Sequence, residues 1–141
     1  MELRDEENGW QLSLENGFVQ LIQIDFRLGL FLSDTSGTVQ LYVETPCWLK
    51  GAYGEASLNP SESSSLAPIL PFFNTKVIGV AIQKNGRLRV EFGDGHTLEV
   101  DPDGSYEAWQ LSCTSIACVL ICAPGGEVSF FRQPERPTKA A

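Results

Sequence analysis

The chain has 141 residues, which fits one domain and is long enough to bury a hydrophobic core without disulfides or metals. Its composition, 43% hydrophobic and 20% charged, is ordinary for a globular protein and excludes disordered and fibrous classes. Eighteen acidic against ten basic residues give a net charge of -8. Nucleic acid is therefore a poor candidate partner, and a basic protein is a good one. Solubility alone is the simpler explanation of the acidic charge.

The first residues, Met1–Glu7, are charged and lack the apolar run of a secretory signal, and no stretch approaches the ~20 apolar residues of a membrane span. We therefore expect no membrane association and a cytoplasmic location. The oligomeric state stays open.

Turn dipeptides recur along the chain at the close spacing of an all-β fold. They are Asn8-Gly9, Asn16-Gly17, Asn85-Gly86, Asp94-Gly95 and Asp103-Gly104, and the Asn-Gly pairs favour two-residue hairpin turns because both residues tolerate positive φ. Between them apolar and polar residues alternate, so one face of each strand is core and the other is solvated. We predict a mainly antiparallel, two-layer sandwich or half-barrel of about nine or ten strands, forming one domain over residues 1–133.

The apolar residues of the alternating sets define the expected core. They are Val39, Leu41 and Val43; Ile78, Val80 and Ile82; Leu88, Val90 and Phe92; Leu98 and Val100; and Val128 and Phe130. The longest apolar run, Ile116–Ala123, predicts a central strand buried on both faces. Residues 30–46 and 88–102 are both hairpin-like and end in Val, an acidic residue and a nearby proline, which either a duplicated β unit or ordinary hairpin patterning explains.

The segment Gly54–Pro71 interrupts the strand pattern. Asn59 as N-cap and Pro60 at the first helical position predict a short helix within a long loop, with Leu66, Ile69 and Leu70 facing inward. Because long loops in compact domains are often functional, this one is a candidate contact surface. The end of the chain, residues 134–141, has the composition of a disordered tail.

The four cysteines are Cys47, Cys113, Cys118 and Cys122, and they contain no CxxC pair. Cys118 and Cys122 would lie ~13 Å apart along one strand, at ~3.3 Å per residue, which is too far for a disulfide or a shared metal. We therefore expect buried, reduced thiols, with no metal and no cofactor.

Candidate catalytic groups are few. His96 is the only histidine, and with Asp94 it could form a proton-transfer pair, but no motif places a nucleophile. Residues 101–107 imitate the start of a calcium loop with the wrong spacing, so a plain turn is the better interpretation. Paired carboxylates of the glycosidase type, drawn from Glu44, Glu91, Glu99 and Glu107, are an open alternative to a solvated strand face.

Two blocks near the end of the chain carry a resemblance. Tyr106-Glu107-Ala108-Trp109 and Pro124-Gly125-Gly126-Glu127, the second before an aromatic strand, resemble a family of small, uncharacterised bacterial β proteins with YEAW and PGGE motifs. The resemblance runs from about Ile24 to Phe131, and this chain departs from the pattern at Phe130-Phe131, where a tryptophan is expected, and in its serine-rich insert. It implies no activity, and it suggests the single-domain immunity proteins that neutralise toxins.

The leading hypothesis is a non-enzymatic interaction protein that occludes a basic partner with an acidic face. We expect that face to comprise Glu44, Glu91, Glu99, Asp101, Asp103 and Glu107, beside Tyr106 and Trp109. The two aromatic residues serve either as interface anchors or as core packing. The alternatives are a small-molecule-binding domain or hydrolase using a His96/Asp94 cleft, and an accessory subunit that associates through an apolar patch at 48–53.

Overall fold

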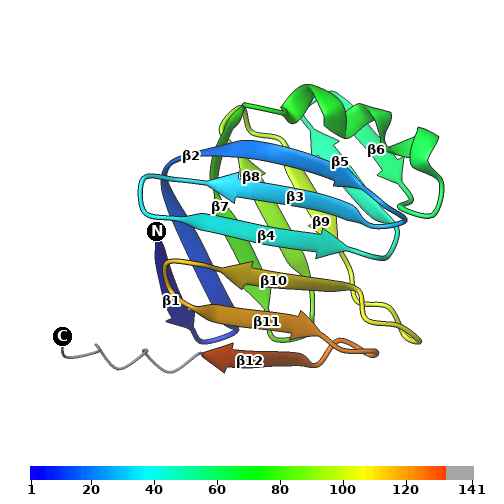
Figure 1. The fold of residues 1–141 in the computed structure, drawn as a ribbon. Helices are drawn as coiled ribbons and strands as arrows, with labels where there is room; N and C mark the ends of the chain where they lie inside the picture. The colour runs from blue at the N-terminus through cyan, green and yellow to red at the C-terminus, as the bar shows by residue number, and fades with distance from the viewer. Residues whose placement is uncertain (133–141) are drawn as a thin grey trace, which may run out of the picture.

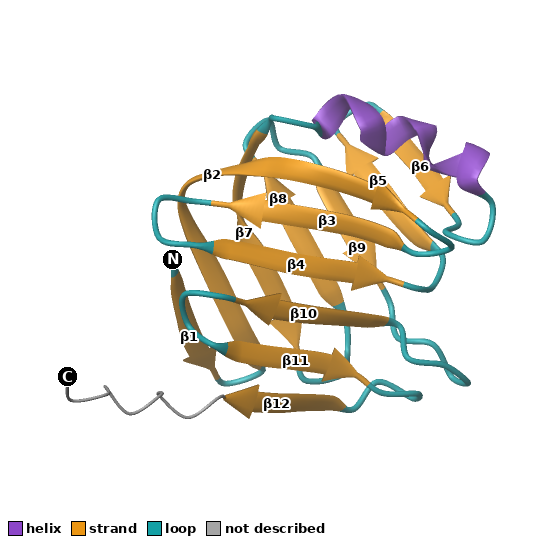
Figure 2. Cartoon of the chain, viewed as in Figure 1, coloured by secondary structure: helices purple, strands orange, loops and turns teal. Residues whose placement is uncertain are grey.

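The structure, a computed structural model, describes residues 1–132. It contains twelve strands and one helical segment (Figure 1, Figure 2). They are β1 (Glu2–Glu6), β2 (Gly9–Ile24), β3 (Leu28–Ser33), β4 (Thr38–Val43), β5 (Cys47–Gly51), β6 (Gly54–Leu58), the 3-10 helix η1 (Ser63–Phe72), β7 (Lys76–Gln83), β8 (Leu88–Phe92), β9 (Thr97–Val100), β10 (Trp109–Cys113), β11 (Cys118–Cys122) and β12 (Val128–Arg132). The expected tail at 134–141 lies outside the described residues.

All paired strands are antiparallel, which confirms the predicted all-β class. The hydrogen-bonded order is β12-β11-β10-β4-β3-β2-β7-β8-β9-β5-β6, with β1 added alongside β2. The strand number exceeds the predicted nine or ten partly because β6 lies in the segment expected to be a long loop. No helix within residues 1–132 is both long and apolar enough to cross a membrane.

Strand β2 belongs to both layers of the fold. Its first part, residues 9–13, pairs with β1 and β7, whereas residues 18–24 pair with β3. The register with β7 shifts between Ser13 and Gly17, and Asn16 has φ 54°. The Asn16-Gly17 dipeptide therefore bends the strand instead of reversing it, and the predicted hairpin turn there is wrong.

The bend divides the sheet into two layers. We call the second part of β2 with β3, β4, β10, β11 and β12 the front sheet, which faces the viewer in Figure 1, and the first part of β2 with β1, β7, β8, β9, β5 and β6 the back sheet. The inward residues of both sheets form one buried core, including Leu12 and Val90 from the back and Leu41 from the front. Trp10 of β2 stacks on Phe130 of β12, with ring centroids 5.9 Å apart.

Two expected core positions are corrected by the structure. A register shift between Val77 and Gly79 in β7 places Val77 inside and leaves Ile78 48% exposed. Strand β11 begins only at Cys118, and its outward residues Val119 and Ile121 are partly exposed. The run from 116 to 123 is therefore not buried on both faces.

The helical segment η1 exists as predicted, but it begins later and winds more tightly. Asn59 does not cap it: the Asn59 side chain accepts a hydrogen bond from the N–H of Ser61 at 3.1 Å, and η1 starts at Ser63. Because a 3-10 helix repeats every three residues, it buries Leu66, Ile69 and Phe72 and leaves Leu70 exposed. The segment covers one end of the sandwich beside β6 (Figure 2).

The two similar hairpins lie in different layers. Residues 30–46 contain the β3–β4 hairpin of the front sheet, and residues 88–102 contain the β8–β9 hairpin of the back sheet. A duplicated unit remains a prediction.

Candidate functional site

Three of the six predicted acidic residues are neutralised within the protein. Glu99 pairs with Lys50 at 2.8 Å and with Arg87 at 3.0 Å, and Arg87 also reaches Asp101 at 3.5 Å. The Lys50 hydrogen bond, assisted by the positive charge of nearby arginines, lowers the pKa of Glu99. Glu91 pairs in the same way with Arg89, at 3.6 Å. The outer face of β8 and β9 is thus a region of balanced charge.

The other three acidic residues gather at the connection between β4 and β5. The Glu44 N–H donates to the carbonyl of Ala108, next to Glu107, at 2.9 Å. The hydroxyl of Thr45 lies 3.4 Å from the carboxylate of Asp103. Within residues 1–132, Glu44, Asp103 and Glu107 take part in no ion pair.

Asp103 organises the loop that carries the exposed aromatic residue. Its carboxylate accepts the backbone N–H of Ser105 at 2.8 Å and of Tyr106 at 3.0 Å, and these bonds lower the pKa of Asp103. Tyr106 is 75% exposed, whereas Trp109 is 0% exposed. Tyr106 is therefore available to a partner, and Trp109 takes the alternative role of core packing.

His96 and Asp94 do form a pair, in the turn between β8 and β9. The Asp94 carboxylate lies 2.8 Å from His96 Nδ1 and accepts the His96 backbone N–H at 2.9 Å. The latter bond is the main cause of a lowered Asp94 pKa. The other ring nitrogen, Nε2, faces Gly51 so closely that a Cβ there would lie 2.5 Å from it. The imidazole is thus held on both sides by the fold.

Two surface hollows flank His96. One of about 330 Å³ is lined by Tyr53 and Glu55, and one of about 270 Å³ is lined by Arg89 and Glu91. Each combines the imidazole with one lining carboxylate. No group of three or more metal-ligating side chains occurs within the described part of the chain.

The apolar patch expected at 48–53 is only partly exposed. Leu49 is buried, Trp48 is half-buried on the outer face of the back sheet, and Tyr53 is fully exposed in the β5–β6 turn. This region offers one accessible aromatic side chain.

The outer face of the front sheet has a character that the sequence interpretation missed. The outward residues at its centre form two rows across the strands, and none is charged. The rows are Leu21, Phe31, Gln40, Ser112, Val119 and Phe131, and Gln23, Gly29, Tyr42, Gln110, Ile121 and Ser129. We call these twelve residues the uncharged face.

Aromatic and amide side chains dominate the centre of the uncharged face. Phe31 contacts Tyr42 edge-on at 5.6 Å, and the guanidinium of Arg27, at the border, lies 4.1 Å from the Tyr42 ring centroid. A hollow of about 190 Å³ opens beside Gln40 and Gln110. The available signal was the absence of charge at outward positions of successive strands, together with the wholly apolar β11.

A comparison with protein families places the chain. The model described as "Family of unknown function (DUF6188)" matches residues 10–132. The chain belongs to the DUF6188 family. This confirms the expected membership of an uncharacterised domain family. Searches of curated proteins and of solved structures gave no match.

In this DUF6188 domain, the two C-terminal blocks meet at one turn of the back sheet. The Trp109 indole N–H donates to the Gly86 carbonyl at 2.8 Å. Gly126 has φ +103°, and a Cβ on it would lie 2.2 Å from the Asn85 carbonyl oxygen. Both blocks therefore join the front sheet to the β7–β8 turn, which gives them a structural role.

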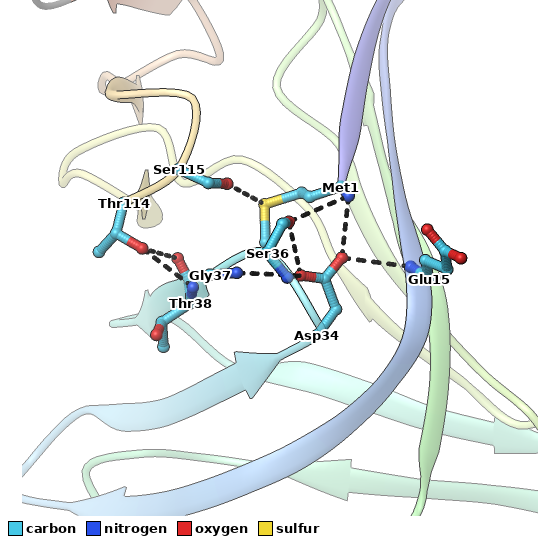
Figure 3. Close-up of polar contacts among 8 residues, drawn as sticks. All are labelled: Met1, Glu15, Asp34, Ser36, Gly37, Thr38, Thr114 and Ser115. Carbon is cyan, nitrogen blue, oxygen red and sulfur yellow. Dashed lines mark hydrogen bonds and ion pairs between the residues drawn. The ribbon is translucent and has the colours of Figure 1, made fainter.

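At the opposite end of the DUF6188 domain, Asp34 joins three segments (Figure 3). Its carboxylate accepts backbone N–H groups of Ser36 at 2.8 Å, Gly37 at 3.1 Å and Glu15 at 3.2 Å, and pairs with the Met1 ammonium at 3.0 Å. Burial alone would raise the pKa of Asp34, but these bonds and that of the Ser36 hydroxyl hold it well below its usual range. Asp34 therefore ties the β3–β4 turn to the bend of β2.

The β10–β11 turn is attached to the same cluster (Figure 3). The Thr38 N–H donates to the Thr114 hydroxyl at 2.9 Å, and the Ser115 hydroxyl donates to Met1 Sδ at 3.4 Å. Two hairpin turns, the residue Met1 and the bend of β2 are thus fixed to one another by polar contacts.

Proposed function

We propose that this protein is a non-enzymatic interaction module that binds a partner protein through the uncharged face. The observation that carries the proposal is the absence of Asp, Glu, Lys and Arg from twelve outward positions on six neighbouring strands. Interface centres are depleted in charged residues and enriched in aromatic ones, because drying an ion is costly. Of the outer faces of the two sheets, the uncharged face has the lower free-energy cost of desolvation.

The partner is expected to be a different protein that presents a similarly uncharged, apolar patch. A second copy is disfavoured because both molecules would carry a net charge of -8 around the contact. Two approaching copies would repel each other, whereas a partner with few acidic residues would not.

A second candidate function rests on the acidic end formed by Glu44, Asp103 and Glu107. These carboxylates lack an ion pair within residues 1–132, and the exposed Tyr106 lies beside them. The arrangement supports the immunity-type proposal, in which a bacterial, cytoplasmic protein blocks a basic toxin. An electrostatic contact of this kind weakens in salt, whereas a contact through the uncharged face does not.

The test uses charge insertions that keep the shape of the side chain. The double variant Gln40→Glu/Gln110→Glu places two negative charges at the centre of the uncharged face. The control Gln11→Glu/Gln83→Glu adds the same charge on β2 and β7 of the back sheet. Each protein, tagged, is used to capture partners from lysate of the source organism at low and high salt, and the binding constant of any captured protein is then measured.

We expect a partner whose binding persists at high salt and that binds the control variant as tightly as the wild type. It should bind the Gln40→Glu/Gln110→Glu variant at least about tenfold more weakly, because burying an unpaired charge costs several kcal/mol. Equal binding to both variants would refute the proposal. A basic partner released by salt, and lost on charge reversal at Glu44 and Glu107, would establish the acidic end instead. No specific partner would favour small-molecule screening at the His96 hollows.

A further inference from the structure

Cys113 and Cys118 face each other at the end of the β10–β11 hairpin. The two residues are direct antiparallel partners, and both side chains lie on the inward side of the front sheet, 5% and 1% exposed. Both are free thiols. Cys118 and Cys122 lie on the same strand and are too far apart to pair, whereas Cys113 of the neighbouring strand lies directly opposite Cys118.

The pairing satisfies the distance requirement for a disulfide. Directly opposite residues of antiparallel strands have Cα atoms about 4.5 to 5.5 Å apart, within the range of about 4.4 to 6.8 Å found in disulfides. We propose that Cys113 and Cys118 are a redox-active pair that forms an intramolecular disulfide on reaction with a small disulfide such as oxidised glutathione. The strand pairing already places the two residues side by side, and because both thiols are nearly buried, glutathione reaches them during local opening of this end of the hairpin.

The two thiols have distinct roles in this reaction. The contact between the two paired thiols lowers the pKa of Cys118 and raises that of Cys113. Cys118, as thiolate, attacks one sulfur of oxidised glutathione and releases one glutathione thiolate. Cys113 then loses its proton to solvent and attacks Cys118 Sγ, which releases the second glutathione. The protein loses two hydrogens, and one oxidised glutathione becomes two reduced ones.

The other two cysteines provide internal controls. Cys47 lies opposite Leu58, and burial raises its pKa to about 12. Cys122 lies between Trp109 and Val128, and its thiol donates to the Gly86 carbonyl at 3.6 Å. Neither has a cysteine opposite it, so neither is expected to form this bond.

The turn that the disulfide would close is already fixed. Thr114, within that turn, is hydrogen-bonded to Thr38 of β4 (Figure 3). Oxidation would therefore lock a hairpin whose next residue pair, Ser112 and Val119, belongs to the uncharged face.

The experiment incubates the folded wild-type protein with oxidised glutathione, quenches with an alkylating agent, and measures intact mass and non-reduced peptides. With the quench carried out in denaturant, we expect two alkyl groups instead of four, a mass about 2 Da below that of a doubly alkylated chain without a disulfide, and one crosslinked peptide pair, Cys113 with Cys118, with Cys47 and Cys122 alkylated. Four alkylated cysteines, or a bond that includes Cys47 or Cys122, would overturn the proposal.

Single variants assign the roles, and circular dichroism before oxidation confirms that each is folded. Cys113→Ala should stop at the mixed disulfide and retain one glutathionyl group on Cys118. Cys118→Ala should remain unmodified, while Cys122→Ala should oxidise like the wild type. A crosslink that persists in Cys113→Ala would contradict the assignment, and the wild-type peptide map decides the matter even if a variant does not fold.

Discussion

Replacing Trp109 with phenylalanine should destabilise the protein strongly without changing its surface. The indole is fully buried and its N–H donates to the Gly86 carbonyl at 2.8 Å. The substitution removes this donor and leaves the buried carbonyl with only the weak Cys122 thiol at 3.6 Å. The smaller ring also leaves a void where the front sheet meets the β7–β8 turn.

The size of the effect follows from these two losses. An unsatisfied buried carbonyl costs about 1 to 3 kcal/mol. Losing the buried carbons of the five-membered ring costs roughly 1.5 kcal/mol more, at about 0.8 kcal/mol per methylene equivalent. We expect a decrease of about 3 to 4 kcal/mol in the free energy of unfolding. For 141 residues this corresponds to a fall in Tm of roughly 10 to 13 °C.

Urea unfolding followed by far-UV circular dichroism measures this change without relying on tryptophan emission. The matched control is Trp48→Phe, because the Trp48 indole is only partly buried, on the outer face of the back sheet. The control should cost less than about 1 kcal/mol, in the range of surface substitutions. Equal costs for the two variants, or a Trp109→Phe cost below about 1 kcal/mol, would refute the role assigned to the bond with Gly86.

Three further changes test other parts of the fold. Because the folded-state pKa of Asp34 is lowered, its contribution is present above the unfolded pKa, near pH 4, and is lost as the pH falls toward the folded value. Asp34→Asn should therefore lower the free energy of unfolding by about 2 kcal/mol at neutral pH, and the variant should lose stability less steeply than the wild type as the pH falls. Urea midpoints that change with pH in parallel for the variant and the wild type would contradict this. Gly126→Ala should cost at least about 3 kcal/mol, because it combines positive φ with a clash against Asn85, whereas Gly125→Ala, which has positive φ but open space around it, should cost only about 1 kcal/mol. Similar denaturation midpoints for the two glycine variants would show that the contact is unimportant. Val77→Thr, at a buried position, should lower the free energy of unfolding by about 1 to 3 kcal/mol, and Ile78→Thr, at an exposed position, by less than about 0.5 kcal/mol. The reverse order in thermal melts would show that the register shift in β7 lies elsewhere.

Much of the fold could be predicted from local chemistry. The dipeptides Asn85-Gly86 and Asp94-Gly95 do form hairpin turns, and the alternation of Val39, Leu41 and Val43 does mark one buried face. The hairpin turn predicted at Asn16-Gly17 is wrong because a positive φ at Asn16 is compatible both with a hairpin turn and with a bend inside a strand. The difference is decided by β7, which pairs with both sides of the bend and is distant in sequence.

The candidate site was harder to predict because its signal is distributed. No single strand reveals the uncharged face, since each contributes only two outward residues to it. The acidic residues were easy to find but not to interpret, because the pairing of Glu99 with Lys50 depends on the contact between β5 and β9. Strand order, which local patterns do not encode, decides both cases.

The two-sided pairing of β2 also sets the order in which the chain can fold as it is synthesised. Its C-terminal part meets β3 after a short turn, whereas Leu12 in its N-terminal part must wait for Val80 of β7. A nascent chain that ends before β7 therefore exposes the apolar inner side of the first hairpin. Exposed apolar strands of this kind are aggregation-prone, so we expect the ribosome-bound intermediate, rather than the finished domain, to be the form that engages chaperones.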